Sequence, residues 1–79
     1  MPRQTNMNTK TRFGIIISNR LKEIDKTQKD FAQEIGRTQV YVYKLLNGLY
    51  NPSVKTLCKI SKVTGIGMEE LTKALLDKS

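Results

Sequence analysis

Two short apolar patterns with helical spacing, separated by a single glycine, constrain the fold of this chain more than any other feature. Each pattern places three apolar side chains on one face of a helix. These side chains are Phe31, Ala32 and Ile35 before the glycine, and Val42, Leu45 and Leu46 after it. Gly36 can adopt a positive φ without steric penalty, so it can end one helix and redirect the chain. We therefore expect two short helices joined by a tight turn.

The segment before these helices, and the residues that flank them, also favour helical structure. A first helix is expected to run to about residue 24, with an inner face made of Phe13, Ile17, Leu21 and Ile24. Thr27 and Asp30 form a capping-box pattern, which predicts that the next helix starts there. The helix after Gly36 is expected to begin near Thr38 and to end at Asn47–Gly48.

Two more helices are predicted in the second half of the chain. Ser53, after Pro52, suits the cap of a helix. The expected inner face of that helix is Val54, Leu57, Ile60 and Ser61. After the breaks at Gly65 and Gly67, the pair Glu69–Glu70 lies where helix dipoles favour carboxylates. The inner face of this last helix is expected to be Leu71 and Leu75. Since no segment has the pattern of a strand, the sequence predicts an all-α domain of five helices.

Charge is unevenly distributed along the chain. Its 14 Lys and Arg residues face 7 Asp and Glu residues, which gives a formal net charge of +7. Acidic residues stop at Glu34 and resume only at Glu69. The cations between them are Arg37, Lys44, Lys55, Lys59 and Lys62. The cationic middle of the chain indicates an anionic partner.

The composition argues against several other classes of protein. The chain has no histidine and one cysteine, Cys58, so the usual zinc sites and an internal disulfide are not expected. Cys58 is expected at the edge of the core. We expect no enzymatic activity, since no acid–base pair, phosphate loop or cofactor motif is visible. The longest apolar run, 15–17, is too short for a membrane span, and no signal sequence is visible, so a cytoplasmic location is expected.

The two helices around Gly36 have the spacing of a helix-turn-helix, whose second helix enters the major groove of DNA. On a helical wheel the outer face of that second helix carries Gln39, Val40, Tyr43, Lys44 and Asn47. Gln39 can pair with an adenine edge, Lys44 with guanine or phosphate, and Val40 with a thymine methyl. Without further support, a merely solvated surface would explain this face equally well.

Several motifs along residues 13–75 together resemble one family. They are the pair Phe13-Gly14, the segment Thr27-Gln28-Lys29-Asp30-Phe31-Ala32, the pair Asn47-Gly48, the triplet Asn51-Pro52-Ser53 and the closing segment 64–71. In order and spacing the chain resembles the phage repressor and Cro family of lambda-repressor-like helix-turn-helix proteins. Each motif is weak alone, and their shared register is the informative feature. The resemblance implies a DNA-binding regulator with the five-helix fold of that family.

The resemblance also implies roles for individual positions. Gln28 would contact phosphate and support Gln39, the first recognition residue. Val40 and Lys44 would face bases, and Asn47 would contact the DNA backbone. Side chains at the helix start and flank, and in the following loop, would meet phosphates. The complete set of expected DNA-binding residues is Gln28, Arg37, Thr38, Gln39, Val40, Tyr41, Tyr43, Lys44, Asn47 and Tyr50.

The sequence also departs from the family at a few positions. Leu21 and Leu46 stand where many members pair a buried arginine with a glutamate. This joint change supports the alignment, because packed apolar residues can replace a buried ion pair at little cost. Asp25 replaces a usual glycine and Lys26 a usual apolar residue, so the turn between the first two helices is expected to differ.

The chain is expected to comprise a flexible basic arm, residues 1–11, and a DNA-binding domain, residues 12–79. Arg3, Lys10 and Arg12 would allow the arm to enter a minor groove, although a frayed terminus is the simpler interpretation. Lys55, Lys59 and Lys62 are expected to form an ordinary solvated stripe.

The expected function is regulation of transcription, as a repressor, by a homodimer on a near-palindromic operator of double-stranded DNA. The last helix, with Met68, Leu75 and Leu76, is the candidate dimer surface. The alternative is an antitoxin-type module that binds a protein and regulates its own operon; toxin and polymerase are the protein partners considered. A membrane-surface peptide is disfavoured, because the cations do not line one long amphipathic helix.

Overall fold

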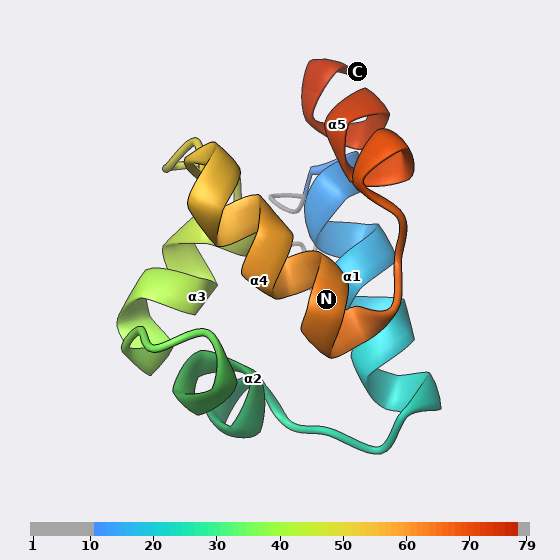
Figure 1. The fold of residues 1–79 in the computed structure, drawn as a ribbon. Coiled ribbons are helices and arrows are strands. Elements are labelled where there is room, and N and C mark those ends of the chain that lie inside the picture. Colours follow the sequence, from blue (N-terminus) through green and yellow to red (C-terminus); the bar gives the residue numbers. More distant parts are fainter. Residues whose placement is uncertain (1–10, 78–79) are drawn as a thin grey trace, which may run out of the picture.

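The computed structural model describes residues 11–77, which form five helices and no strand. The helices are α1 (Arg12–Glu23), α2 (Gln28–Glu34), α3 (Gln39–Leu46), α4 (Val54–Thr64) and α5 (Met68–Leu76). In Figure 1, α2 and α3 lie together on one side of the molecule, and α5 packs beside α1 at the opposite end. The predicted all-α, five-helix fold is confirmed. Within residues 11–77 no helix combines the length and hydropathy needed to cross a bilayer.

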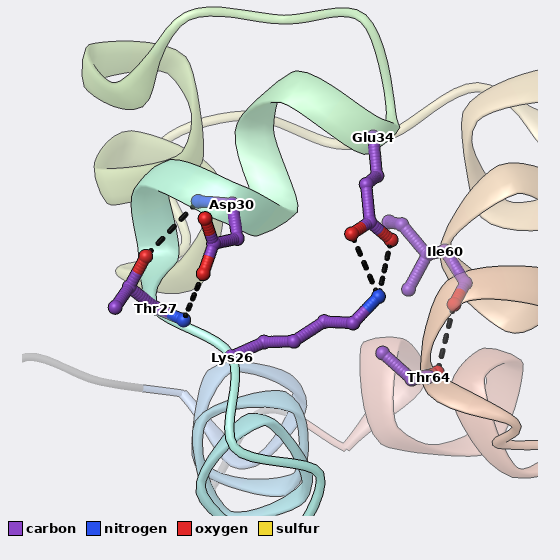
Figure 2. Close-up of polar contacts among 6 residues, drawn as sticks. All are labelled: Lys26, Thr27, Asp30, Glu34, Ile60 and Thr64. Carbon is purple, nitrogen blue, oxygen red and sulfur yellow. Dashed lines mark hydrogen bonds and ion pairs between the residues drawn. The ribbon is translucent and has the colours of Figure 1, made fainter.

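Hydroxyl side chains cap the starts of α1 to α4. Each accepts a hydrogen bond from the backbone N–H three residues later, and the capping residues are Thr11, Thr27, Thr38 and Ser53. The capping box predicted for α2 is present, because Asp30 also accepts a hydrogen bond from the Thr27 N–H at 3.1 Å (Figure 2). This backbone hydrogen bond, followed by the one to the Thr27 side chain, holds the pKa of Asp30 below its ordinary value.

The core draws apolar side chains from all five helices. The inner faces predicted for the two short helices are confirmed, since no residue among them is more than 2% exposed: Phe31, Ala32, Ile35, Val42, Leu45 and Leu46. Leu21 and Leu46 lie in the same core cluster. The apolar replacement of the family's ion pair is therefore packed, as expected.

The backbones of α1 and α3 approach each other closely at Gly14. A Cβ atom at this position would lie 1.9 Å from the carbonyl oxygen of Leu46, which is far inside van der Waals contact. Only glycine therefore allows α1 to pack this tightly against the end of α3. The contact fixes the distance between α3 and the rest of the fold.

Positive φ angles redirect the chain at both turns around α2. Gly36, between α2 and α3, has a φ of 72°, as its predicted role requires. Asp25, between α1 and α2, has a φ of 60° and is the one residue other than glycine with a positive φ in the described chain. Lys26 then reaches both carboxylate oxygens of Glu34 at the end of α2, at 2.5 and 2.7 Å (Figure 2). Asp25 thus adopts a positive φ, which a glycine would also adopt, and Lys26 adds an ion pair beside this turn.

The inner face predicted for α4 is wrong at its first residue. Val54 is 72% exposed, whereas Thr56 and Thr64 are buried on the same row as Ile60. This row has spacing i, i+4, i+8, and Val54 lies off it. The buried threonines are compatible with the core because their hydroxyls are satisfied: Ser53 donates to Thr56, and Thr64 donates to the Ile60 carbonyl at 2.7 Å (Figure 2).

Cys58 is exposed, so its predicted place at the edge of the core is also wrong. It follows the buried Leu57 and lies on the solvent side of α4. Lys55, Lys59 and Lys62 are exposed on the same helix, as predicted. In α5, Leu71 is buried as predicted, and Leu75 is half-buried against the core.

Thr11 and Arg12 belong to the start of α1 in the structure. The Thr11 hydroxyl caps the helix, and the Arg12 guanidinium lies 2.7 Å from the Asp77 carboxylate after α5. Arg12 is thus paired with a carboxylate at the helix start, whereas the sequence alone groups it with an arm that could enter a minor groove. The arm cations Arg3 and Lys10 lie outside the described residues, as does the rest of segment 1–10.

Arg20 ties α1 to the end of α4, a contact that the sequence does not predict. Its Nε donates to the Thr64 carbonyl at 2.7 Å, and its Nη1 lies 3.0 Å from Glu23. Because Thr64 is the last residue of α4, this bond satisfies one of the carbonyls that a helix end leaves without an intrahelical donor.

Candidate nucleic-acid interface

The outer face of α3 presents the side chains expected from the helical wheel. Gln39, Val40 and Tyr43 are exposed, while Lys44 and Asn47 are half-buried. Eight helical residues span about 12 Å, close to the width of the major groove of B-DNA. The helix is therefore short enough to lie in the groove over its whole length.

The apolar content of this outer face is high for a solvent-facing surface. Val40 is 63% and Tyr43 is 59% exposed, whereas Val42 between them is fully buried. The core thus occupies one side of α3, and apolar side chains also project from the other. Val40 and Tyr43 are therefore available for apolar contacts, such as one with a thymine methyl in the major groove.

Two of the expected site residues lie at helix starts. Thr38 is the N-cap of α3, and its hydroxyl accepts a hydrogen bond from the Tyr41 N–H at 3.0 Å. Gln28 is the first residue of α2 and is half-buried. The cap holds the first turn of α3 in place, and with it Gln39, the first helical residue.

Aromatic rings and cations are in contact along one flank of α3. The rings of Tyr41 and Tyr50 stack with centroids 5.3 Å apart and an interplanar angle of 27°. The guanidinium carbon of Arg37 lies 4.7 Å from the centroid of the Tyr41 ring. The Lys44 Nζ lies 5.8 Å from the centroid of the Tyr50 ring. The structure therefore brings together one residue before α3, two within it and one from the following loop.

A surface hollow adjoins this group at the start of α3. It is lined by Gly36, Arg37, Thr38, Val40, Tyr41 and Tyr50. The hollow thus combines a cation, two tyrosines and the exposed Val40. Such a lining suits a ligand that is anionic on one side and apolar on the other, as a nucleotide is.

The cations at this site lack the carboxylate partners found elsewhere in the fold. Within residues 11–77 the ion pairs are Arg12–Asp77, Arg20–Glu23 and Lys26–Glu34. Arg37 and Lys44 instead contact aromatic rings, which leave their positive charge uncompensated. Their charge is therefore available to an anionic partner.

Metal chemistry has no evident place in the described part of the chain. Among residues 11–77 no group of three or more histidine, cysteine or carboxylate side chains is placed to hold a metal ion. The residues around α3 are polar, cationic and aromatic, so they can bind an anionic partner through hydrogen bonds and charge.

The sequence predicts which residues form the candidate site but not the contacts that they make with one another. All ten expected residues lie on α3, on its flanks or at the start of α2. The contact of Arg37 with Tyr41 follows a spacing of four, which a helix-based reading can anticipate. The stacking of Tyr50 on Tyr41 depends on the path of the loop after Gly48, and no local pattern encodes that path.

Comparison with known proteins identifies the family of this chain. A family model described as Helix-turn-helix matches residues 17–71, from the middle of α1 into α5. The chain belongs to the helix-turn-helix family of the Cro and phage-repressor type. One relative of this helix-turn-helix protein is the "ImmF control region 10 kDa protein" of Bacillus phage phi105. The two are 30% identical over 60 residues, which cover 76% of this chain and 67% of the relative.

Membership of this family establishes the broad function. The helix-turn-helix protein is a DNA-binding transcriptional regulator, and its family is one of regulators rather than enzymes. In the structure α2 and α3 are the two helices joined by the Gly36 turn. In helix-turn-helix motifs in general the second helix is the one that enters the major groove, and α3 is the second helix of the motif here.

Proposed function

We propose that this protein is a sequence-specific repressor that binds a near-palindromic operator as a homodimer, with α3 of each protomer in the major groove. The observation that supports this proposal best is the outer face of α3, where Gln39, Val40 and Tyr43 are exposed on a helix whose inner face is fully packed. A rigidly held helix with exposed polar and apolar groups can discriminate base edges.

The proposal divides the site residues into two groups. Gln39 and Val40 at the first turn of α3 contact base edges, and Lys44 one turn further donates to a guanine edge or to a phosphate. Tyr43 extends this surface. The remaining residues position the protein on the DNA backbone, either by direct contact or by holding another side chain in place, and they are Gln28, Arg37, Thr38, Tyr41, Asn47 and Tyr50. Base contacts select the sequence, whereas backbone contacts set register and add affinity that depends on salt.

A homodimer would place its two α3 helices in successive major grooves, about 34 Å apart. The proposed dimer surface is α5, at the opposite end of the molecule from α2 and α3 (Figure 1). Leu76 is 74% exposed there, and Met68 and Leu75 are half-buried. Repression would follow from occupancy of an operator that overlaps a promoter, and the control-region relative and the phage-repressor type of the family support this choice.

Selection of bound sequences from random duplex DNA at about 150 mM salt tests the proposal, because nonspecific attraction is weakened at that ionic strength. The expected result is an enriched motif with two inverted half-sites, one helical turn apart centre to centre. Absence of any motif, with binding that disappears smoothly as salt rises, would contradict the proposal and would redirect the search to protein partners.

A promoter–reporter assay then tests repression. The selected operator is placed across the promoter in one reporter and well upstream of it in another. The protein is expected to reduce expression only from the first reporter. Increased expression from the second reporter would indicate an activator, and unchanged expression from both would contradict a role in regulation through this site.

A further inference from the structure

Tyr50 is an exposed aromatic residue whose ring makes two defined contacts. It stacks on Tyr41 and lies beside the ammonium of Lys44, while Tyr41 in turn contacts the guanidinium of Arg37. Tyr50 is 43% exposed and lies outside the buried core cluster. Its ring therefore organises a surface instead of filling the interior.

We propose that Tyr41 and Tyr50 are positioning residues, whose stacked rings hold Arg37 and Lys44 in place to meet phosphates of the DNA backbone. This inference rests on the proposed DNA-binding function and names the residues that prepare the binding surface. It differs from the sequence-based interpretation of Tyr50, in which the residue itself contacts a phosphate.

The physical basis is the entropy of long cationic side chains. Arginine and lysine in solvent populate many rotamers, and that freedom is lost when they bind an anion. A carboxylate partner would restrict the rotamers but would also compensate the charge. An aromatic ring restricts them and leaves the positive charge available. Within residues 11–77 no ion pair involves Arg37 or Lys44, so ring contacts are the restraint that the structure provides.

The positions of these residues also fit the role. Arg37 precedes α3, Lys44 lies in its last turn, and Tyr50 belongs to the loop that follows. The stack therefore connects the loop to both ends of the recognition helix. Tyr50 contacts Lys44 directly and reaches Arg37 only through Tyr41, so the stack links the positions of the two cations.

Three variants separate the positioning role from a direct contact. Tyr50→Phe keeps the ring and removes the hydroxyl, whereas Tyr50→Leu removes the ring and keeps an apolar side chain. Lys62→Ala, on the exposed side of α4, is a control for the loss of one charge elsewhere. Thermal unfolding by circular dichroism checks that each variant remains folded. Binding is measured against the selected operator and a random duplex, over a range of salt concentrations.

The proposal predicts that Tyr50→Phe binds both duplexes like the unmodified protein. Tyr50→Leu is expected to bind both about five-fold to ten-fold more weakly, because Lys44 loses its ring contact and Tyr41, which holds Arg37, loses its stacking partner, so more side-chain freedom is lost on binding. Its salt dependence should not change, since both cations are still present. Arg37→Ala should weaken binding less in the Tyr50→Leu background than alone, because the two residues act together.

A measurement on the free protein gives an independent check. The ε-methylene protons of Lys44 should show an upfield NMR shift from the Tyr50 ring, retained in Tyr50→Phe and lost in Tyr50→Leu. Equal weakening by Tyr50→Phe and Tyr50→Leu would overturn the proposal in favour of a hydroxyl contact. Unchanged binding by Tyr50→Leu, or additive effects with Arg37→Ala, would also overturn it.

The same data distinguish failure of this inference from failure of the proposed function. The ratio of operator to random-duplex affinity for the unmodified protein tests sequence-specific binding. The ratio of variant to unmodified affinity on the random duplex tests positioning alone. A protein that binds DNA without preference could therefore still confirm the role of the stack, and one that binds no DNA would overturn both.

Discussion

The outer faces of α3 and α4 look similar in composition but differ in how their side chains are held. Both helices expose a valine, Val40 in α3 and Val54 in α4, and both carry lysine, one residue in α3 and three in α4. The α4 surface has more charge, with Lys55, Lys59 and Lys62 all exposed. Only near α3 do cations in the described chain contact aromatic rings. Charge density alone would therefore select α4, whereas the proposed DNA-binding surface is α3.

The two helices also differ in how they are fixed to the fold. At its C-terminal end α3 meets α1 through a contact between backbones at Gly14 and Leu46. The end of α4 is held to α1 by a side chain, through the bond from Arg20 to the Thr64 carbonyl. A side-chain bond can adapt to small displacements, whereas a contact between backbones cannot. The close contact between backbones thus belongs to α3, the helix that is proposed to read DNA.

The largest expected effect tests this rigid contact. Gly14→Ala would place a methyl group against the Leu46 carbonyl, so α1 and α3 must separate. We expect a loss of about 3 kcal/mol or more in the free energy of unfolding, at the upper end of the range for overpacking. Urea denaturation monitored by circular dichroism measures this change.

Gly67→Ala is the matched control for Gly14→Ala. A Cβ at Gly67 meets no atom within 4 Å, and its φ of −65° suits any residue. The expected loss is about 1 kcal/mol or less, from the poorer capping by alanine. Equal losses for the two variants would contradict the special role of the α1–α3 contact.

The next effect concerns the base-reading surface. Gln39→Ala is expected to reduce discrimination at one base pair of the operator by about 1–3 kcal/mol, because a bidentate contact to a base is lost. Binding to random DNA should change little. Competition with operators that carry single substitutions measures the effect. Loss of affinity that is uniform over all sequences would place Gln39 among the backbone contacts.

A smaller effect is expected on the salt dependence of DNA binding, which should differ between the cations near α3 and those of α4. Arg37→Ala is expected to weaken binding to all sequences and to reduce the slope of log affinity against log salt by about 0.9, the value for one phosphate contact. Lys62→Ala removes the same charge from α4 and should leave the slope unchanged. Lys59 is a poorer control, because its ammonium group lies close to the Gly36 turn of the motif. A Cβ built at Gly36 would be 4.0 Å from the Lys59 Nζ. If Arg37→Ala and Lys62→Ala changed the salt slope equally, the claim that DNA phosphates contact the cations near α3 and not those of α4 would be contradicted.

The smallest expected effect comes from a residue outside both faces. The Thr27 hydrogen bonds lower the pKa of Asp30 in the folded state, so they stabilise the fold above the unfolded-state pKa of about 3.9. This stabilisation is lost as the pH falls through the lower, folded-state pKa.

Comparison with Asp30→Asn measures this contribution. The difference between the urea midpoints of the two proteins should be constant above about pH 5 and should shrink below about pH 4. A difference that does not change with pH would show that the ionised carboxylate is not responsible. Operator affinity at neutral pH should be the same for both, which separates stability from DNA contact.

The sequence predicts those parts of the fold that depend on local pattern. The spacing of Val42, Leu45 and Leu46, the caps at Thr27 and Ser53 and the turn at Gly36 each involve neighbouring residues, and each is present. The outer face of α3 follows from the same periodicity. The identity of the candidate surface was therefore accessible before the structure, while the base and phosphate contacts made there stay predictions.

The parts that the sequence does not reveal depend on contacts between distant segments. Thr56 and Thr64 were overlooked as core residues because their polarity suggests exposure, and only the structure shows that their hydroxyls are satisfied. Val54 precedes Leu57 and Ile60 at helical spacing, which predicts an inward side chain, but the structure exposes it. The stacking of Tyr50 on Tyr41 requires the path of the loop, and the bond from Arg20 to Thr64 joins residues far apart in the chain.

The central claim is that α3, and not the more highly charged α4, meets DNA. Titration of the ¹⁵N-labelled protein with the selected operator duplex tests it most directly, because amide shifts report which backbone segments contact DNA. We predict that the largest shifts fall on residues 37–44 and 50, with the amides of 55–62 little changed. Large shifts at 55–62, with those of α3 unchanged, would contradict the account.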